Sequence, residues 1–121
     1  MGRIGWRTLA SASLVLGVAA SDLLVGCHSK PTLTEQEEAG KRLYIGRCAH
    51  CHEENDLALK KVPPDLHQVF SQSKLPSGVA ATDAEVQRVV LQGRGMMPAF
   101  TERFNDEQMA ALLAYLHTGL R

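Results

Sequence analysis

Large aromatic side chains are scarce in this sequence, which has one Trp, two Tyr and three Phe among its 121 residues. Strand-like alternation of apolar and polar residues never extends beyond a few positions, and there is no internal repeat. A chain of this length corresponds to one domain, and a domain this small with few large side chains lacks the bulk for a self-sufficient core. We therefore expect a small helical domain whose interior is completed by a bound apolar group.

An excess of either charge is also missing, because 13 Lys and Arg balance 13 Asp and Glu. Removal of residues 1–26 would take away two basic groups, Arg3 and Arg7, and one acidic group, Asp22, which leaves 11 basic against 12 acidic groups. A basic surface is the electrostatic footprint of a nucleic-acid-binding protein. The composition therefore predicts that nucleic acid is not a partner.

The N-terminus has the pattern of an export signal. Met1–Arg7 carries two arginines and no acid, and the apolar stretch Leu9–Ala20 follows. This stretch is short for a membrane span. We predict that residues 1–26 are a signal peptide, that residues 27–33 form a tether, and that the folded domain spans residues 34–121.

The end of this signal resembles the lipobox of bacterial lipoproteins, with the sequence Leu24-Val25-Gly26-Cys27. An unpaired third cysteine is a liability in an oxidising compartment, which favours lipidation of Cys27. The expected location is the periplasmic side of a bacterial membrane or the cell surface, held by a lipid anchor. Residue 28 is His, so the Asp of the inner-membrane retention signal is absent and either membrane fits. The alternative is an ordinary cleaved signal and secretion to the periplasm.

The five residues Cys48-Ala49-His50-Cys51-His52 form the attachment signature of a c-type haem. Positions i and i+3 share one face of a helical turn, so Cys48 and Cys51 can reach the two vinyl groups on one porphyrin edge. His52 follows directly and is placed to bind the iron as the proximal ligand. His50 is expected to face outward without a ligand role. One alternative is a thioredoxin-like dithiol, but this requires a βαβ context and the sequence shows no strands. The other is half of a zinc site, but this requires a second pair of Cys or His ligands, and none follows.

A second informative stretch contains two adjacent methionines, Met96 and Met97, followed by Pro98. A thioether suits haem iron on the side opposite an imidazole. We prefer Met97 as the distal ligand, because Pro98 restricts the backbone of the preceding residue. The rival sixth ligands are His67 and His117, and the bland alternative is that both methionines line an apolar pocket.

Helix signals divide the rest of the domain. Capping boxes of Thr34 with Glu37, Thr82 with Glu85, and Asn105 with Gln108 predict three helix starts. These helices are expected to run into Cys48, to end at Gly93 and to end at Gly119, respectively. A short helix is expected over Asp65–Gln72, after a polar loop at Glu53–Lys61 and the stiff pair Pro63-Pro64, whose carbonyls remain free to accept a hydrogen bond.

Taken together, the chain over roughly residues 35–120 resembles the small single-haem class I cytochromes c of bacteria. The resemblance rests on the haem signature, on Met97-Pro98, and on Gly40, Tyr44, Pro64-Asp65-Leu66 and Leu112-Leu113-Ala114-Tyr115-Leu116. It implies an all-α fold of about four helices around one covalently bound haem c, with the first and last helices crossing.

The resemblance also implies roles for individual residues. Gly40 and Tyr44 should meet Leu112 and Tyr115 where the helices cross. His52 and Met97 are implied as axial ligands, and the carbonyl of Pro64 as the hydrogen-bond partner of His52. Arg94 is a candidate for contact with a haem propionate.

The expected function is one-electron transfer, as a carrier or as the electron-entry module of a respiratory chain or dehydrogenase. Such a protein is not itself an enzyme, takes no small-molecule substrate, works as a monomer and docks with redox partner proteins. The alternative is a haem-based sensor or a peroxidase-like enzyme, which requires an iron site that opens by loss of Met97. A third class, a thiol oxidoreductase or zinc module, would contain no haem.

Overall fold

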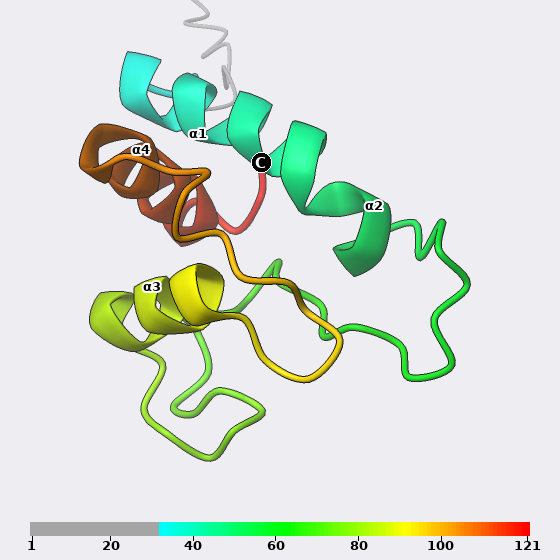
Figure 1. Cartoon of the computed structure of the whole chain (residues 1–121). Coiled ribbons are helices and arrows are strands. Elements are labelled where there is room, and N and C mark those ends of the chain that lie inside the picture. The colour runs from blue at the N-terminus through cyan, green and yellow to red at the C-terminus, as the bar shows by residue number, and fades with distance from the viewer. Residues whose placement is uncertain (1–31) are drawn as a thin grey trace, which may run out of the picture.

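The computed structural model describes residues 32–121, and within them it is built from four helices and no strands (Figure 1). The helices are α1 (Glu35–Arg47), α2 (Ala49–His52), α3 (Asp83–Gln92) and α4 (Asp106–His117). The expected all-α fold is confirmed. None of these helices is long and apolar enough to cross a bilayer. The predicted signal peptide, Cys27 and most of the tether lie outside the described residues.

Side-chain caps explain where α1 and α4 begin. The Glu37 N–H donates to Thr34 Oγ1 (3.2 Å), and the Thr34 N–H donates to the Glu37 carboxylate (2.7 Å). Asn105 and Gln108 make the same reciprocal pair at 2.8 and 3.1 Å. Each pair satisfies two backbone donors that the first helical turn would otherwise leave without partners. These two predicted capping boxes are confirmed.

The predicted capping box of α3 is only half formed. The Glu85 N–H donates to Thr82 Oγ1 (3.4 Å), but the Glu85 carboxylate does not return to the Thr82 N–H. It accepts instead from the Arg88 guanidinium, at 2.6 and 2.9 Å. An arginine three residues further along the helix competes for this carboxylate, because i and i+3 side chains are neighbours on a helix.

The helix predicted at Asp65–Gln72 is wrong. This segment forms hydrogen-bonded turns, such as Val69 N–H to Leu66 O (3.2 Å). The side chain of Asp65 accepts from the His67 N–H (2.8 Å), which closes a local turn. Aspartate side chains that bind nearby backbone groups offer the chain an alternative to the helical ladder.

The core lies where α1 packs against α4, and these two helices lie side by side (Figure 1). Tyr44 and Leu112 are each only 1% exposed, and the Tyr44 and Tyr115 rings are 5.6 Å apart between centroids. Gly40 allows this approach, since a Cβ there would overlap the Ala111 carbonyl and lie 2.8 Å from the Tyr115 Cβ. Gly40 and Tyr44 therefore both meet Tyr115, as the resemblance implied, and Gly40 also lies against Ala111.

The far end of α4 is tied to α3 and to the preceding loop. His117 Nε2 lies 2.7 Å from an oxygen of Asp83 in the first turn of α3. The His117 ring also stacks on Phe70, with centroids 3.8 Å apart. A basic side chain at a helix C-terminus and an acidic one at a helix N-terminus both complement the helix dipoles. These contacts place α3, and the loop that follows it, relative to the α1–α4 pair.

We predict that Gly40→Ala destabilises the protein while Gly46→Ala does not. The added methyl at position 40 has no space, and overpacking of this kind costs about 1–3 kcal/mol. Gly46 is the matched control, because it lies on the same helix and a Cβ there meets nothing within 4 Å. Since alanine is the better helix former by about 1 kcal/mol, Gly46→Ala should be neutral or stabilising.

The measurement is the free energy of unfolding of each haem-loaded variant, from urea denaturation followed by the helical circular dichroism signal. Equal stabilities for the two variants would contradict the close contact of α1 with α4.

Candidate haem site

The signature residues occupy a helical turn of their own at the end of α1. The Cys48 N–H still donates to the Tyr44 carbonyl (2.8 Å), and the His52 N–H donates to the Cys48 carbonyl (2.9 Å). Cys48 is therefore both the C-cap residue of α1 and the N-cap residue of α2. Cys48 and Cys51 are free thiols, and both are half-buried. A rigid first helix thus delivers two thiols with the one-turn spacing that covalent attachment of a porphyrin needs.

The surroundings of Cys48 argue against a redox-active dithiol. Burial raises the pKa of the Cys48 thiol to about 11, an effect only partly offset by the nearby Arg47 guanidinium. A reactive dithiol requires the opposite, a lowered pKa that yields the thiolate. The described residues also contain no strand, so the βαβ context of a thioredoxin-like motif is not found there.

A zinc site built on the two cysteines is not supported either. Within residues 32–121, no set of three His, Cys, Asp or Glu donors close enough to hold a metal includes Cys48 or Cys51. Structural zinc sites take four protein ligands. Among the described residues, the two thiols therefore lack the partners that such a site requires.

The ring of His52 is held by the backbone carbonyl of Pro64, which lies 2.8 Å from His52 Nδ1. A carbonyl oxygen only accepts, so Nδ1 carries the proton and donates it to this bond. In the neutral ring the free lone pair is then on Nε2, which makes no hydrogen bond within the described residues. A neutral imidazole fixed in one tautomer by a second partner is the usual state of a metal-binding histidine.

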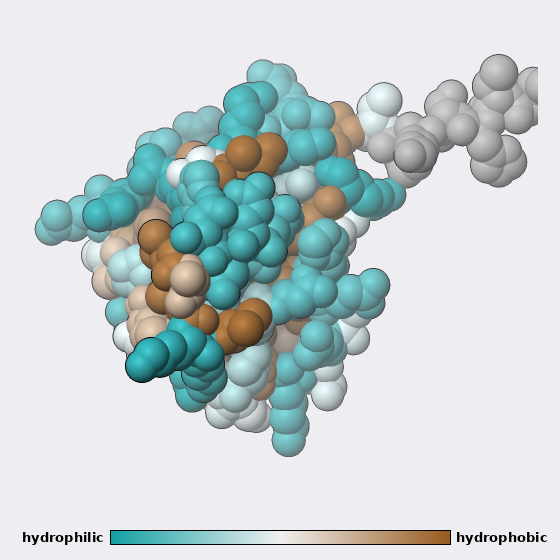
Figure 2. Space-filling view, turned by 90° about the vertical axis from the view of Figure 1, so that its right-hand side faces the viewer, coloured by the Kyte–Doolittle hydropathy of each residue, from teal (hydrophilic) through white to brown (hydrophobic). Residues whose placement is uncertain are grey.

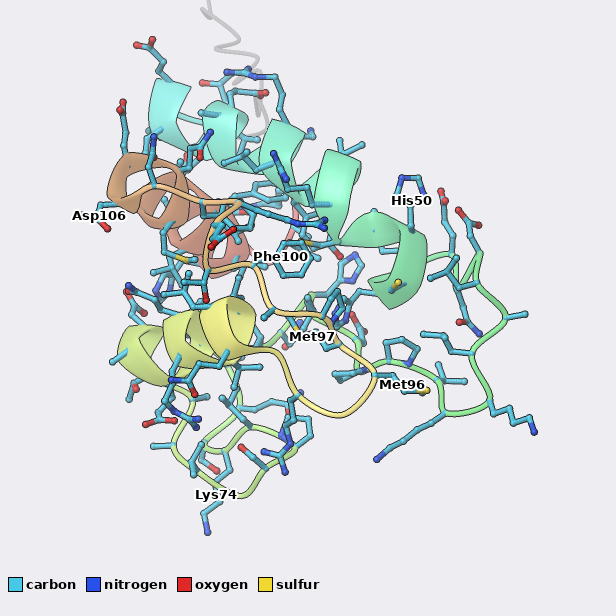
Figure 3. The ribbon with its side chains drawn as sticks, viewed as in Figure 1. His50, Lys74, Met96, Met97, Phe100 and Asp106 are labelled. Atoms are coloured by element: carbon cyan, nitrogen blue, oxygen red, sulfur yellow. The ribbon has the colours of Figure 1, made fainter. Side chains whose placement is uncertain are left out.

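Met96 and Met97 differ sharply in environment. The N–H and C=O groups of Arg94 and Met97 pair reciprocally at 3.0 Å, and Gly95 has a φ of +60°. These values describe a two-residue hairpin turn, which favours glycine at its first central position. Met96, at the tip of the turn, is 56% exposed, whereas Met97 is half-buried and packs against the core. Figure 3 shows Met96 extending outward from the loop and Met97 set back toward the interior.

Contacts that the sequence analysis missed fix this loop to α3. Gly93 ends the helix with a φ of +71°, and a Cβ there would lie 2.5 Å from the Met97 carbonyl and 2.8 Å from the Ala99 nitrogen. The Phe100 N–H donates to the carbonyls of Val90 and Leu91, both at 3.1 Å. A glycine at a predicted helix end, close to the methionines, was the signal available in the sequence.

The remaining predicted site residues are engaged elsewhere or exposed. His67 Nδ1 lies 2.7 Å from Asp65 Oδ1. His117 pairs with Asp83 and stacks on Phe70. Each rival histidine therefore already has a side-chain partner. Arg94 is exposed, and within residues 32–121 its guanidinium makes no ion pair. His50 is exposed, as expected.

An open groove of about 910 Å³ lies between α1 and α4, lined by residues such as Thr34, Arg42 and Gln108. It includes none of the candidate ligands, so it is not the haem site. The donor set on and around α2 does fit a c-type haem. It offers two free thiols one helical turn apart and an imidazole with only Nε2 available.

The comparison with protein families agrees with this fit. Residues 35–116, well over half of the chain, match the family described as cytochrome c oxidase, cbb3-type, subunit III. No solved structure matches the chain. The family carries a covalently bound c-type haem, and Cys48, Cys51 and His52 supply its attachment signature here. The chain therefore belongs to this family of cytochrome c domains, which transfer electrons through a haem.

Proposed function

We propose that this protein is a one-electron carrier or electron-entry module in which His52 and Met97 are the two axial ligands of the haem iron. The observation that carries the proposal is the 2.8 Å hydrogen bond from His52 Nδ1 to the Pro64 carbonyl. It leaves Nε2 as the free ring nitrogen of a histidine that directly follows the second attachment cysteine. When bound, the haem supplies the one-electron couple, and the protein sets its potential and its access to partners.

Pro64 is suited to accept the hydrogen bond from His52 because it follows another proline, Pro63. Neither residue has an N–H, and the segment they occupy is not helical, so its carbonyls are not consumed by a helical ladder. Hydrogen bonding at Nδ1 makes the opposite nitrogen more electron-rich and fixes the plane of the ring. A ring held in this way moves little when the iron changes oxidation state, and this favours rapid electron transfer.

The half-buried position of Met97 supports it as the second ligand over Met96. A thioether opposite an imidazole raises the reduction potential of the haem. The hairpin turn and the close packing of Gly93 hold the Met97 backbone, so its sulfur is presented by a stiff loop. Arg94, which precedes this turn and is exposed, remains our candidate for contact with a haem propionate.

The redox partner should dock on the side of the molecule that carries α2 and the loop after it. Figure 2 faces this side and shows apolar groups among a largely hydrophilic surface. Exposed apolar side chains in the neighbouring loops include Leu57 (67% exposed), Val62 (72%) and Met96 (56%). Scattered apolar groups with a polar surround suit a small, transient interface of the kind used by electron-transfer proteins.

We further propose that the domain works on the periplasmic side of a membrane or at the cell surface, as a monomer. The support is the export pattern of residues 1–26 and the lipobox-like residues before Cys27. A lipid on Cys27 would keep the haem domain close to membrane-bound partners. Mass spectrometry of the mature N-terminus decides between this anchor and a plain secreted form, in which Cys27 carries no lipid.

We predict that Met97→Ala, but not Met96→Ala, removes the iron–thioether charge-transfer band from the spectrum of the oxidised protein. The same variant should have a lower reduction potential, on the order of a tenth or more of the roughly 0.8 V range that axial ligands span. Met96→Ala is the matched control, since it removes the same atoms from an exposed neighbouring position.

Retention of the band in Met97→Ala would reject Met97 as a ligand. Carbon monoxide should leave the spectrum of the reduced wild-type protein unchanged at neutral pH. Ready binding of carbon monoxide would favour the sensor or peroxidase-like class, because it requires an open iron position.

We predict that combining Cys48→Ala with Cys51→Ala abolishes covalent haem attachment and leaves the chain largely unfolded. The wild-type haem should remain with the protein through acid-acetone extraction and give a c-type pyridine haemochrome. The apo domain should not fold, because a core this small depends on the apolar surface of the cofactor. A native-like helical signal from the double variant would contradict this dependence.

A further inference from the structure

We propose that His50, Glu54 and Asp56 form a surface site for a divalent transition-metal cation, separate from the haem iron. One ring nitrogen and two carboxylate oxygens from these residues lie within 4.8 Å of one another. All three side chains are exposed, and Figure 3 shows His50 pointing away from the body of the domain. The sequence interpretation gave His50 no ligand role, and the proposed electron transfer does not use it.

The backbone brings the carboxylates to His50, independently of the side chains. The Asp56 N–H donates to the His50 carbonyl (2.8 Å), and the Glu54 N–H donates to the Ala49 carbonyl (3.1 Å). The chain therefore folds back on α2 immediately after His52. Asn55, between the two acidic residues, has a φ of +46°, a conformation that asparagine tolerates better than most residues.

The spacing of the donor atoms suits a shared cation. His50 Nδ1 lies 3.0 Å from Asp56 Oδ2. Two ligands of a tetrahedral site, each about 2.1 Å from the metal, are roughly 3.4 Å apart, a few tenths of an ångström more than this separation. A cation would thus replace the present hydrogen bond with two coordinate bonds after small rotations of exposed side chains, and Glu54 would close the third position.

Two other histidines of the domain provide an internal comparison. His67 pairs with Asp65 and His117 pairs with Asp83, both at 2.7 Å. Within residues 32–121, neither pair has a third donor close enough to share a metal, whereas the pair of His50 with Asp56 does. The distinguishing feature of the proposed site is therefore the additional carboxylate, and not the mere presence of a His–Asp pair.

The donor types indicate which cations fit. An imidazole with carboxylates suits Zn²⁺, Ni²⁺ and Cu²⁺, while Ca²⁺ and Mg²⁺ prefer oxygen ligands alone. Three protein ligands leave coordination positions for water or for a side chain of a docked partner. In the haem-loaded protein Cys48 and Cys51 are consumed by thioether bonds, so they do not compete for the cation.

The test is titration of the purified haem-loaded protein with Zn²⁺, followed by isothermal calorimetry. One Zn²⁺ should bind, and His50→Ala and Asp56→Asn should each weaken it at least about tenfold, since even the loss of outer-shell partners costs about 10–100-fold. His67→Ala is the matched control and should bind Zn²⁺ as the wild type does. Absence of binding to the wild type, unchanged binding to His50→Ala, or an equal loss in His67→Ala would overturn the proposal.

A second measurement guards against misfolding of the His50 variant and separates this proposal from haem ligation. Electron paramagnetic resonance of one added Cu²⁺ should show coupling to one imidazole nitrogen, with the coupling retained in Met97→Ala. Asp56→Asn, which leaves the attachment motif intact, should lower the Cu²⁺ affinity while the haem spectrum stays native. Nitrogen coupling that persists in His50→Ala would show that the copper lies elsewhere and would reject the site.

Discussion

The close contact of α1 with α4 is the constraint on which the rest of the domain depends. Gly40 lets the α1 backbone contact the Ala111 carbonyl, and the Tyr44 and Tyr115 rings pack against each other nearby. The position of α1 sets the position of Cys48, because the attachment turn begins at the last hydrogen bond of this helix. The position of α4 sets that of α3 through Asp83 and His117. The α1–α4 pair therefore positions the segments on both sides of the proposed haem site.

The proposed haem site is assembled from three separate segments of the chain. The attachment turn supplies the thiols and His52, the loop at Pro64 orients the imidazole, and the hairpin turn after Gly93 carries Met97. Only the first of these segments is helical. The other two are irregular chain held by backbone hydrogen bonds and glycine contacts, which is how a small domain places functional groups with few large side chains to pack.

The attachment turn directs its two histidines to different partners. His52 turns inward to the Pro64 carbonyl, while His50, two residues earlier, turns outward to Asp56. Covalent attachment of a cofactor at Cys48 and Cys51 would stiffen both histidines at once. A cation held by the outward face would thus sit on a part of the chain that is directly bonded to the redox group.

The sequence by itself determined the helix starts at Thr34 and Asn105 and the thiol spacing, because these depend on residues within one turn of each other. It also indicated the all-α fold and the haem. Only the tertiary structure decided which methionine is half-buried, which nitrogen of His52 is free and which acidic residues lie beside His50. The predicted helix at Asp65–Gln72 and the reciprocal cap of Glu85 were wrong because Asp65 and Arg88 offered competing partners. Where a side chain has several hydrogen-bond partners within reach, the packing of the folded chain decides which one it binds. A local sequence pattern does not contain that information.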